Sequence, residues 1–170
     1  AQESRGLGDV YKRQEEATVL AWLDGGGRVD ERFEYTFGDG SRASGMTLLM
    51  VVMANGHVEL AEALLRRGAD VSLQTSQGTT ALMLAAANGF EKLVELVLRR
   101  GAAIDLQSNT GDTALIRAAF NGRPAALLRL LPALFHGRAV VCAGRVDLLL
   151  LRRVGPVAYT HLRAPEPPGH

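Results

Sequence analysis

A fixed spacing of 33 residues constrains the fold of this chain more than any other feature. Gly45, Gly78 and Gly111 are separated by 78 − 45 = 33 and 111 − 78 = 33 residues. The same step separates three Asn-Gly pairs, Asn55-Gly56, Asn88-Gly89 and Asn121-Gly122. A period in this range is typical of stacked-repeat proteins, in which each unit covers the hydrophobic face of its neighbour.

Each period contains the signals of two short helices joined by a turn. Thr47 precedes the apolar run Leu48–Ala54, and as an N-cap its hydroxyl can accept a hydrogen bond from an amide of the first helical turn. After Asn55-Gly56 a second apolar-periodic run ends at Arg66-Arg67 and Gly68, which is a helix stop. We therefore predict complete units at 45–77 and 78–110.

The flanking segments match this unit only in part. Residues 15–44 resemble a half-unit cap with an inserted loop, and residues 111–131 form a partial unit. Pro132 then stands where the earlier units have arginine, so residues 132–157 are predicted to be degenerate, with one further helix-like run at Val146–Arg153. Gly144 lies only 144 − 122 = 22 residues after Gly122.

The inserted loop, Asp30–Ser44, admits two interpretations. Gly26 and Gly68 are 68 − 26 = 42 residues apart, nine more than the period. Loops that outgrow their repeat tend to carry function. The alternative is an elongated hairpin whose aromatic residues, Phe33, Tyr35 and Phe37, cover the first helix pair.

Composition excludes several classes of protein. The 19 basic and 18 acidic residues are interspersed, which is unlike a nucleic-acid-binding protein. Cys142 is the only cysteine, so no intrachain disulfide can form, in keeping with a cytoplasmic, reducing location. The apolar runs are shorter than the ~20 residues of a membrane helix, and the N-terminus lacks the apolar core of a signal peptide.

No motif predicts catalysis, a cofactor or a metal ion. Gly25-Gly26-Gly27 follows a predicted helix and lacks the pattern of a phosphate-binding loop. Asp30–Asp39 lacks the spacing of a calcium loop. The four histidines have no cysteine or carboxylate partners at the spacing of metal ligands; they are His57, His136, His161 and His170. We therefore predict a protein that is not an enzyme.

The run GMTLLMVVMANGHVELAEALLRRGADV resembles the ankyrin repeat, whose signature is GxTPLHxAAxxGHxxVVxLLLxxGADV. The resemblance is strong over Gly45–Arg123. It departs at the signature proline, replaced by Leu48, Ala81 and Ala114, and at the signature histidine, replaced by Met50, Met83 and Ile116. Packing must therefore replace the usual side-chain hydrogen bonds at the start of each inner helix.

The resemblance implies an all-α solenoid of antiparallel helix pairs, with hairpin-like loops and a concave surface that binds another protein. We expect a monomer whose partner contacts lie at the turn tips and at the inner-helix ends. The candidate contact residues are Met46, Asn55, Ser76, Gln77, Thr79, Ala87, Asn88, Asn109, Thr110, Asp112, Phe120 and Asn121.

Two kinds of candidate residue also have a purely structural interpretation. Phe120 is the most anchor-like, because aromatic residues dominate interface energies, but it could equally be a core residue that seals the third unit. The repeated asparagines could serve only as turn residues that tolerate a left-handed backbone.

Both ends of the chain carry a second resemblance. Asp9–Gln14 resembles the translation of a transposase-type sequencing adapter, and Ala158–Ala164 resembles the same adapter read from the opposite end. We therefore assign no function to residues 1–14 and 158–170, which we expect to be disordered or artefactual.

Three hypotheses follow for the whole chain. The leading one is a non-enzymatic protein-interaction module. The second is a fragment of a larger enzyme or signalling protein, in which the repeats recruit a substrate. The third is a sequence that folds stably only around its middle, because repeat arrays need about three units.

Overall fold

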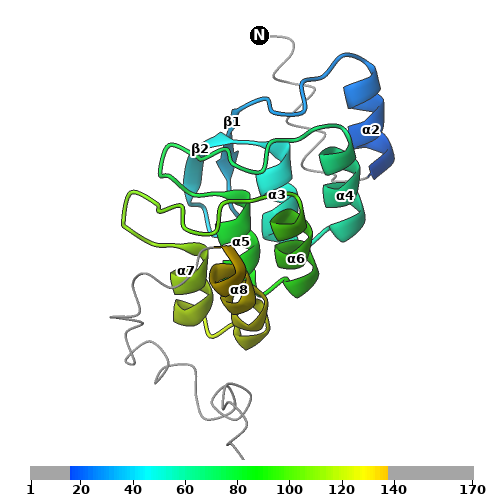
Figure 1. Cartoon of the computed structure of the whole chain (residues 1–170). Helices are drawn as coiled ribbons and strands as arrows, with labels where there is room; N and C mark the ends of the chain where they lie inside the picture. The colour runs from blue at the N-terminus through cyan, green and yellow to red at the C-terminus, as the bar shows by residue number, and fades with distance from the viewer. Residues whose placement is uncertain (1–15, 138–170) are drawn as a thin grey trace, which may run out of the picture.

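The computed structural model describes residues 16–137, which form a stack of antiparallel helix pairs preceded by a β-hairpin (Figure 1). The elements in chain order are α2 (Glu16–Asp24), β1 (Phe33–Thr36), β2 (Arg42–Met46), α3 (Leu48–Asn55), α4 (Val58–Arg66), α5 (Ala81–Asn88), α6 (Glu91–Arg99), α7 (Ala114–Phe120) and α8 (Pro124–Gly137). The predicted all-α solenoid is confirmed, with one small sheet. The predicted tails, 1–14 and 158–170, lie outside the described residues.

The helices form two layers. The inner helices α3, α5 and α7 lie side by side, and the outer helices α4, α6 and α8 form the second layer (Figure 1). Six consecutive residues are buried in α3, Leu48–Met53, and six in α5, Ala81–Ala86. An outer helix buries only one side: α6 buries Leu93, Val94 and Val97. The inner layer is therefore the continuous core that joins one unit to the next.

A threonine caps the first turn of every inner helix. The hydroxyl of Thr47 accepts a hydrogen bond from the Met50 amide at 3.4 Å, and Thr80 and Thr113 cap α5 and α7 in the same way. Met50 itself is almost fully buried. The predicted N-cap at Thr47 is thus confirmed, and packing surrounds the residue that replaces the signature histidine.

The inserted loop is a β-hairpin that packs on the core. Strands β1 and β2 pair antiparallel, with Phe33 opposite Met46 and an irregularity between Phe33 and Glu34. Phe33, Tyr35 and Phe37 are partly buried against the hydrophobic core. The rings of Tyr35 and Phe37 meet edge to face, with centroids 5.0 Å apart. These contacts agree with the hairpin alternative for residues 30–44.

Helix α2 caps the N-terminal end of the array. Val19 is fully buried, and Trp22 and Leu23 pack against the core. The carboxylate of Asp24 pairs with Arg67 at the end of α4, with the two charged atoms 2.7 Å apart. The predicted half-unit therefore covers the first helix pair.

The third helix pair extends further than its sequence suggests. Helix α8 continues through Pro132 to Gly137, six residues past the predicted boundary at Leu131. Leu127 and Leu130 are buried, so packing anchors α8 in the core just before the proline. The remainder of the predicted degenerate segment lies outside the described residues.

Candidate partner-binding surface

The turn tips that precede α5 and α7 present the exposed residues Ser76, Gln77, Asn109 and Thr110. Each tip is held by hydrogen bonds of its own. In the first, the Thr75 hydroxyl accepts from the amides of Gln77 at 3.3 Å and of Thr79 at 3.1 Å. These bonds fix the backbone, so the exposed side chains project from a rigid turn.

Successive tips are also bonded to one another. The Ser76 amide donates to the Ser44 carbonyl at 3.0 Å, and the Asn109 amide donates to the Gln77 carbonyl at 2.9 Å. The Asn109 side chain adds a bond to the Ser76 carbonyl at 3.0 Å. The tips of adjacent units therefore form one hydrogen-bonded ladder along the edge of the array.

The tip that precedes α7 also holds an acidic side chain, Asp112, by hydrogen bonds. The Thr110 hydroxyl donates to the Asp112 carboxylate at 2.9 Å. The amide of Asp112 donates to the hydroxyl of Ser108 at 3.2 Å. Asp112 is thereby placed at the start of α7, facing the inner-helix surface.

The candidate asparagines at the inner-helix ends are exposed, but their amides are engaged. Asn55 donates to the Val51 carbonyl at 2.8 Å, and Asn121 donates to the Arg117 carbonyl at 2.8 Å. Asn88 donates to Leu84 in its own helix and to Ala54 in the preceding unit. These side-chain bonds satisfy carbonyl groups at the ends of the inner helices. The left-handed backbone belongs to the following glycines, Gly56 and Gly89, and Asn121 itself has φ −87°.

Two candidate residues do not lie on the surface. Met46 is 1% exposed because the pairing of β2 with β1 turns its side chain into the core. Thr79 is 6% exposed because it lies beneath the turn tip, where its amide donates to the Thr75 hydroxyl. Neither side chain can contact a partner while the unit is folded, so we remove both from the proposed surface.

A cleft of about 280 Å³ lies at the end of the inner-helix surface. Its lining residues are Ala87, Asp112, Ile116, Arg117, Phe120 and Asn121. The Phe120 side chain is 77% exposed, so the interpretation of Phe120 as a core residue is wrong. The structure thus brings together four residues that the sequence singled out from two different units.

Arg117 lies in this cleft and was missed by sequence reasoning. Its Nε atom is buried without a hydrogen-bond partner and lies 3.7 Å from an Asp112 carboxylate oxygen. One terminal nitrogen donates to the Thr79 hydroxyl at 3.4 Å. The 33-residue period offered a signal, because position 117 is equivalent to position 84 (117 − 33 = 84). Position 84 holds Leu84, which is buried, so an arginine at position 117 departs from the pattern of the preceding unit. The charged Arg117 therefore gives the third unit a different inner-helix surface from the second unit, which has Leu84 at the equivalent position.

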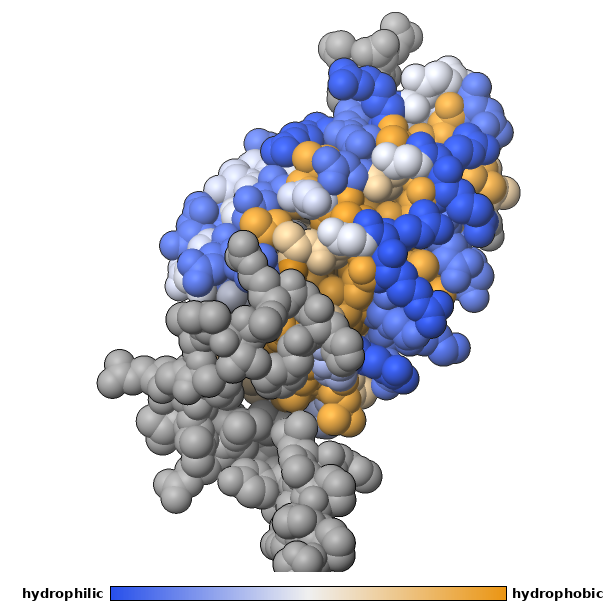
Figure 2. All heavy atoms as spheres, viewed as in Figure 1, coloured by the Kyte–Doolittle hydropathy of each residue, from blue (hydrophilic) through white to orange (hydrophobic). Residues whose placement is uncertain are grey.

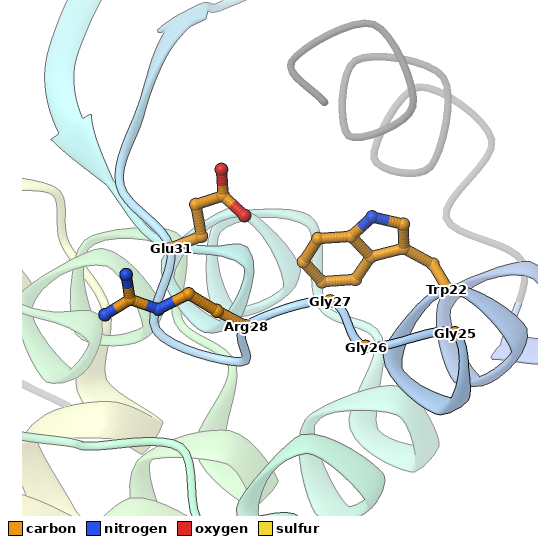
Figure 3. Close-up of a pocket in the computed structure, with 6 residues that line it drawn as sticks. All are labelled: Trp22, Gly25, Gly26, Gly27, Arg28 and Glu31. Carbon is orange, nitrogen blue, oxygen red and sulfur yellow. The ribbon is translucent and has the colours of Figure 1, made fainter. Parts of the chain in front are cut away.

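A second cleft, of about 420 Å³, lies at the glycine triplet (Figure 3). It is lined by Trp22, Gly25, Gly26, Gly27, Arg28 and Glu31. A Cβ on Gly27 would lie 2.5 Å from the Trp22 ring, so the indole rests directly on the glycine. The triplet follows the C-terminal end of α2, where carbonyl groups repel anions. This geometry does not suit a phosphate.

Three of the arginines at the outer-helix ends form ion pairs within the array. Arg66 pairs with Glu62 and Arg99 with Glu95, one helical turn earlier in each case. Arg67 pairs with Asp24. The charges of these three arginines are therefore largely balanced within the array.

Within residues 16–137 we found no group of three side chains of the metal-ligating types. Over the same residues, no helix has the length and apolar character needed to cross a membrane.

Comparison with models of protein families identifies the repeats. A family model described as ankyrin repeats (3 copies) matches residues 48–138, which are 138 − 48 + 1 = 91 of the 170 residues. The search against curated proteins returned no match.

Proposed function

This chain belongs to the ankyrin repeat family, and we propose that it is a non-enzymatic module that binds another protein through its turn tips and the adjoining inner-helix ends. Ankyrin repeats are in general protein–protein interaction modules. The observation that carries the proposal is the exposed Phe120 side chain beside the cleft.

Phe120 supports the proposal because its position needs no aromatic residue for folding. The equivalent residues in the first two units are Ala54 and Ala87, since 120 − 33 = 87 and 87 − 33 = 54. An aromatic ring that is 77% exposed contributes little burial to the folded array. The same ring can bury a large area against a partner, which is the usual character of an interface anchor.

The cleft beside Phe120 also constrains the partner's chemistry. Arg117 and Asp112 lie 3.7 Å apart and balance each other's charge. Ile116 adds an apolar wall. A partner that inserts an apolar side chain, with neutral hydrogen-bonding groups around it, fits this lining better than a strongly charged one.

The turn tips favour binding because they are rigid before a partner arrives. The ladder formed through Ser44, Ser76, Gln77 and Asn109 holds the tips at fixed spacing. Binding then loses little loop entropy, which leaves more of the contact energy for affinity. Gln77 and Asn109 retain exposed side chains from which specificity can arise.

The proposal is tested by capturing partners on the immobilised full chain. The test variant combines Gln77→Ala, Asn109→Ala and Asp112→Ala. A matched control places three alanines on the exposed outer-helix side, at Glu59, Lys92 and Arg100. Circular dichroism confirms that both variants fold.

We expect the control to retain the proteins captured by the wild type and the tip variant to lose them. Capture of the same proteins by all three chains would contradict binding through the tips.

A further inference from the structure

The dipeptide Asn-Gly ends all three inner helices, as Asn55-Gly56, Asn88-Gly89 and Asn121-Gly122. This dipeptide is chemically labile, because a glycine has no Cβ to hinder attack by its own backbone nitrogen on the side-chain amide of the preceding asparagine. The three copies contain the same two residues. Their surroundings in the fold therefore decide which copy reacts.

In each folded copy the reacting nitrogen is held by a hydrogen bond. The amides of Gly56, Gly89 and Gly122 donate to carbonyl groups of their own inner helices at 3.0, 3.2 and 3.1 Å respectively. The nitrogen must leave this bond before it can meet the asparagine side chain. The reaction thus proceeds from a locally opened helix end, and its rate follows the free energy of that opening.

The following unit covers the first two copies. The Phe90 ring lies over Gly56, since a Cβ added there would be 2.8 Å from the ring. The Arg123 side chain covers Gly89 at the same distance, and its Nε donates to the Ala87 carbonyl at 3.2 Å. Opening of either helix end therefore has to displace a side chain of the next unit.

Asn88 has a further restraint that Asn121 lacks. The Asn88 side chain donates to the Ala54 carbonyl of the preceding unit at 3.3 Å. The equivalent acceptor for Asn121 is the Ala87 carbonyl, since 121 − 33 = 88 and 87 − 33 = 54, but Arg123 donates to that carbonyl instead. Within residues 16–137, the Asn121 side chain donates only to Arg117 of its own helix.

The third copy lies at the open end of the described array. A Cβ on Gly122 would meet nothing within 4 Å among the residues that the structure describes. Asn121 and Gly122 are both exposed, whereas Gly56 and Gly89 are partly buried. Hydrophobic atoms reach the surface over the lower end of α8, where the described array stops (Figure 2). The helix end at Asn121 is therefore the least restrained of the three.

We propose that Asn121 is a site of spontaneous deamidation in the folded chain. The Gly122 nitrogen bonds to the side-chain carbonyl carbon of Asn121, and the bond from that carbon to the side-chain nitrogen breaks. Ammonia leaves with the proton of the Gly122 amide, which closes a cyclic imide. Water then opens the imide at either carbonyl. The product at position 121 is an aspartate or an isoaspartate.

The new carboxylate changes the cleft beside Phe120. Asn121 lines this cleft together with Asp112 and Arg117, whose charges balance each other. A carboxylate at position 121 makes the lining net negative, and the cleft then favours a partner with a cationic group. This consequence for binding rests on the proposed function, whereas the modification itself does not.

The modification is tested by incubating the full chain at mildly alkaline pH. Proteolytic digestion and mass spectrometry then follow the three Asn-Gly peptides, whose mass rises when the amide becomes a carboxyl group. The same chain in urea gives the rate of each site without the fold, and each folded rate is divided by it. Asn121→Gln is the control, because its longer side chain closes the ring poorly.

We expect position 121 to convert at least about fivefold faster than positions 55 and 88 on this relative scale, the factor that one hydrogen bond of average net strength provides. Equal relative rates at the three sites, or a faster reaction at position 55 or 88, would overturn the proposal.

Arg123→Ala tests whether the covering side chain protects the second copy. This variant removes the side chain over Gly89 and the bond to the Ala87 carbonyl. The rate at Asn88 should rise by about fivefold relative to the rate at Asn55, for the same reason. An unchanged ratio of these two rates would contradict protection by the neighbouring unit.

Asn121→Asp tests the consequence for binding separately, with a partner captured by the wild-type chain. A changed affinity supports the effect of the carboxylate on the cleft. An unchanged affinity contradicts that effect and leaves the deamidation of Asn121 standing.

Discussion

Replacing Gly78 with alanine tests whether the turn tips bind one another. Gly78 adopts a left-handed backbone at φ +74°, and a Cβ built on it would lie 3.0 Å from the backbone amide of Asn109. Gly111 occupies the equivalent position of the next unit at φ +80°, where a Cβ would meet nothing within 4 Å. Gly111→Ala is therefore a matched control that changes the backbone preference alone.

The expected difference between the two variants follows from the contacts that Asn109 makes. The left-handed backbone costs an alanine about 1–2 kcal/mol in either position. The smaller unfolded-state gain from removing a glycine, about 0.4–1 kcal/mol, is also common to both. Gly78→Ala must additionally displace Asn109, which bonds to the Gln77 and Ser76 carbonyls. Two such bonds contribute about 1–3 kcal/mol in total.

Urea unfolding followed by circular dichroism measures this difference directly. We expect Gly78→Ala to lose about 1–3 kcal/mol more stability than Gly111→Ala, with similar m values. Gly45→Ala should fall between them, because its Cβ would lie 3.3 Å from the Ser76 amide. Equal losses at Gly78 and Gly111 would refute the hydrogen-bonded ladder as a source of stability.

The remaining predictions concern helix capping, packing and one carboxyl group. Thr80→Ala removes the cap of α5 and should lower the free energy of unfolding by about 1 kcal/mol in thermal melts. Leu82→Ala should cost about 2–5 kcal/mol in urea unfolding, and the partly exposed Leu115→Ala clearly less. The hydrogen bonds from the side chain and amide of Ser41 lower the pKa of Asp39 below its ordinary 3.8. NMR titration should therefore show this lowered pKa, and Ser41→Ala should raise it. Because the folded-state pKa is lowered, any stabilisation from Asp39 is present above the unfolded-state pKa and is lost as pH falls through the folded-state value.

Local signals predicted the architecture well because repeat units depend mainly on themselves and their nearest neighbours. Thr47 caps its helix where the sequence placed the cap. The Asn-Gly turns end their helices as expected, with Gly56 and Gly89 in the left-handed region. Each of these features is set by a few adjacent residues, so one unit's pattern could be transferred to the others.

The end of α8 could not be predicted in the same way. Pro132 is a strong local signal against a helix interior, yet α8 runs through it. The burial of Leu127 and Leu130 depends on α6 and α7, which a local pattern does not include. Tertiary packing thus overrides the propensity of a single residue.

The candidate surface was only partly predictable for a related reason. The repeat offsets located the turn tips and inner-helix ends, but not the direction of each side chain. Met46 points into the core because a hairpin replaces the usual tip before α3, and Phe120 points outward because no further inner helix covers it in the described chain. Exposure depends on neighbouring elements, so it required the structure.

The most direct test of partner binding is calorimetric titration of a captured partner with the wild type, Phe120→Ala and Leu128→Ala. Among the described residues, these are the two large hydrophobic side chains that are exposed. Only Phe120 lines the cleft. We expect Phe120→Ala to weaken binding by about tenfold or more, as for an anchor worth at least 1.4 kcal/mol, and Leu128→Ala to retain wild-type affinity. Unchanged affinity in Phe120→Ala would contradict the proposed binding surface.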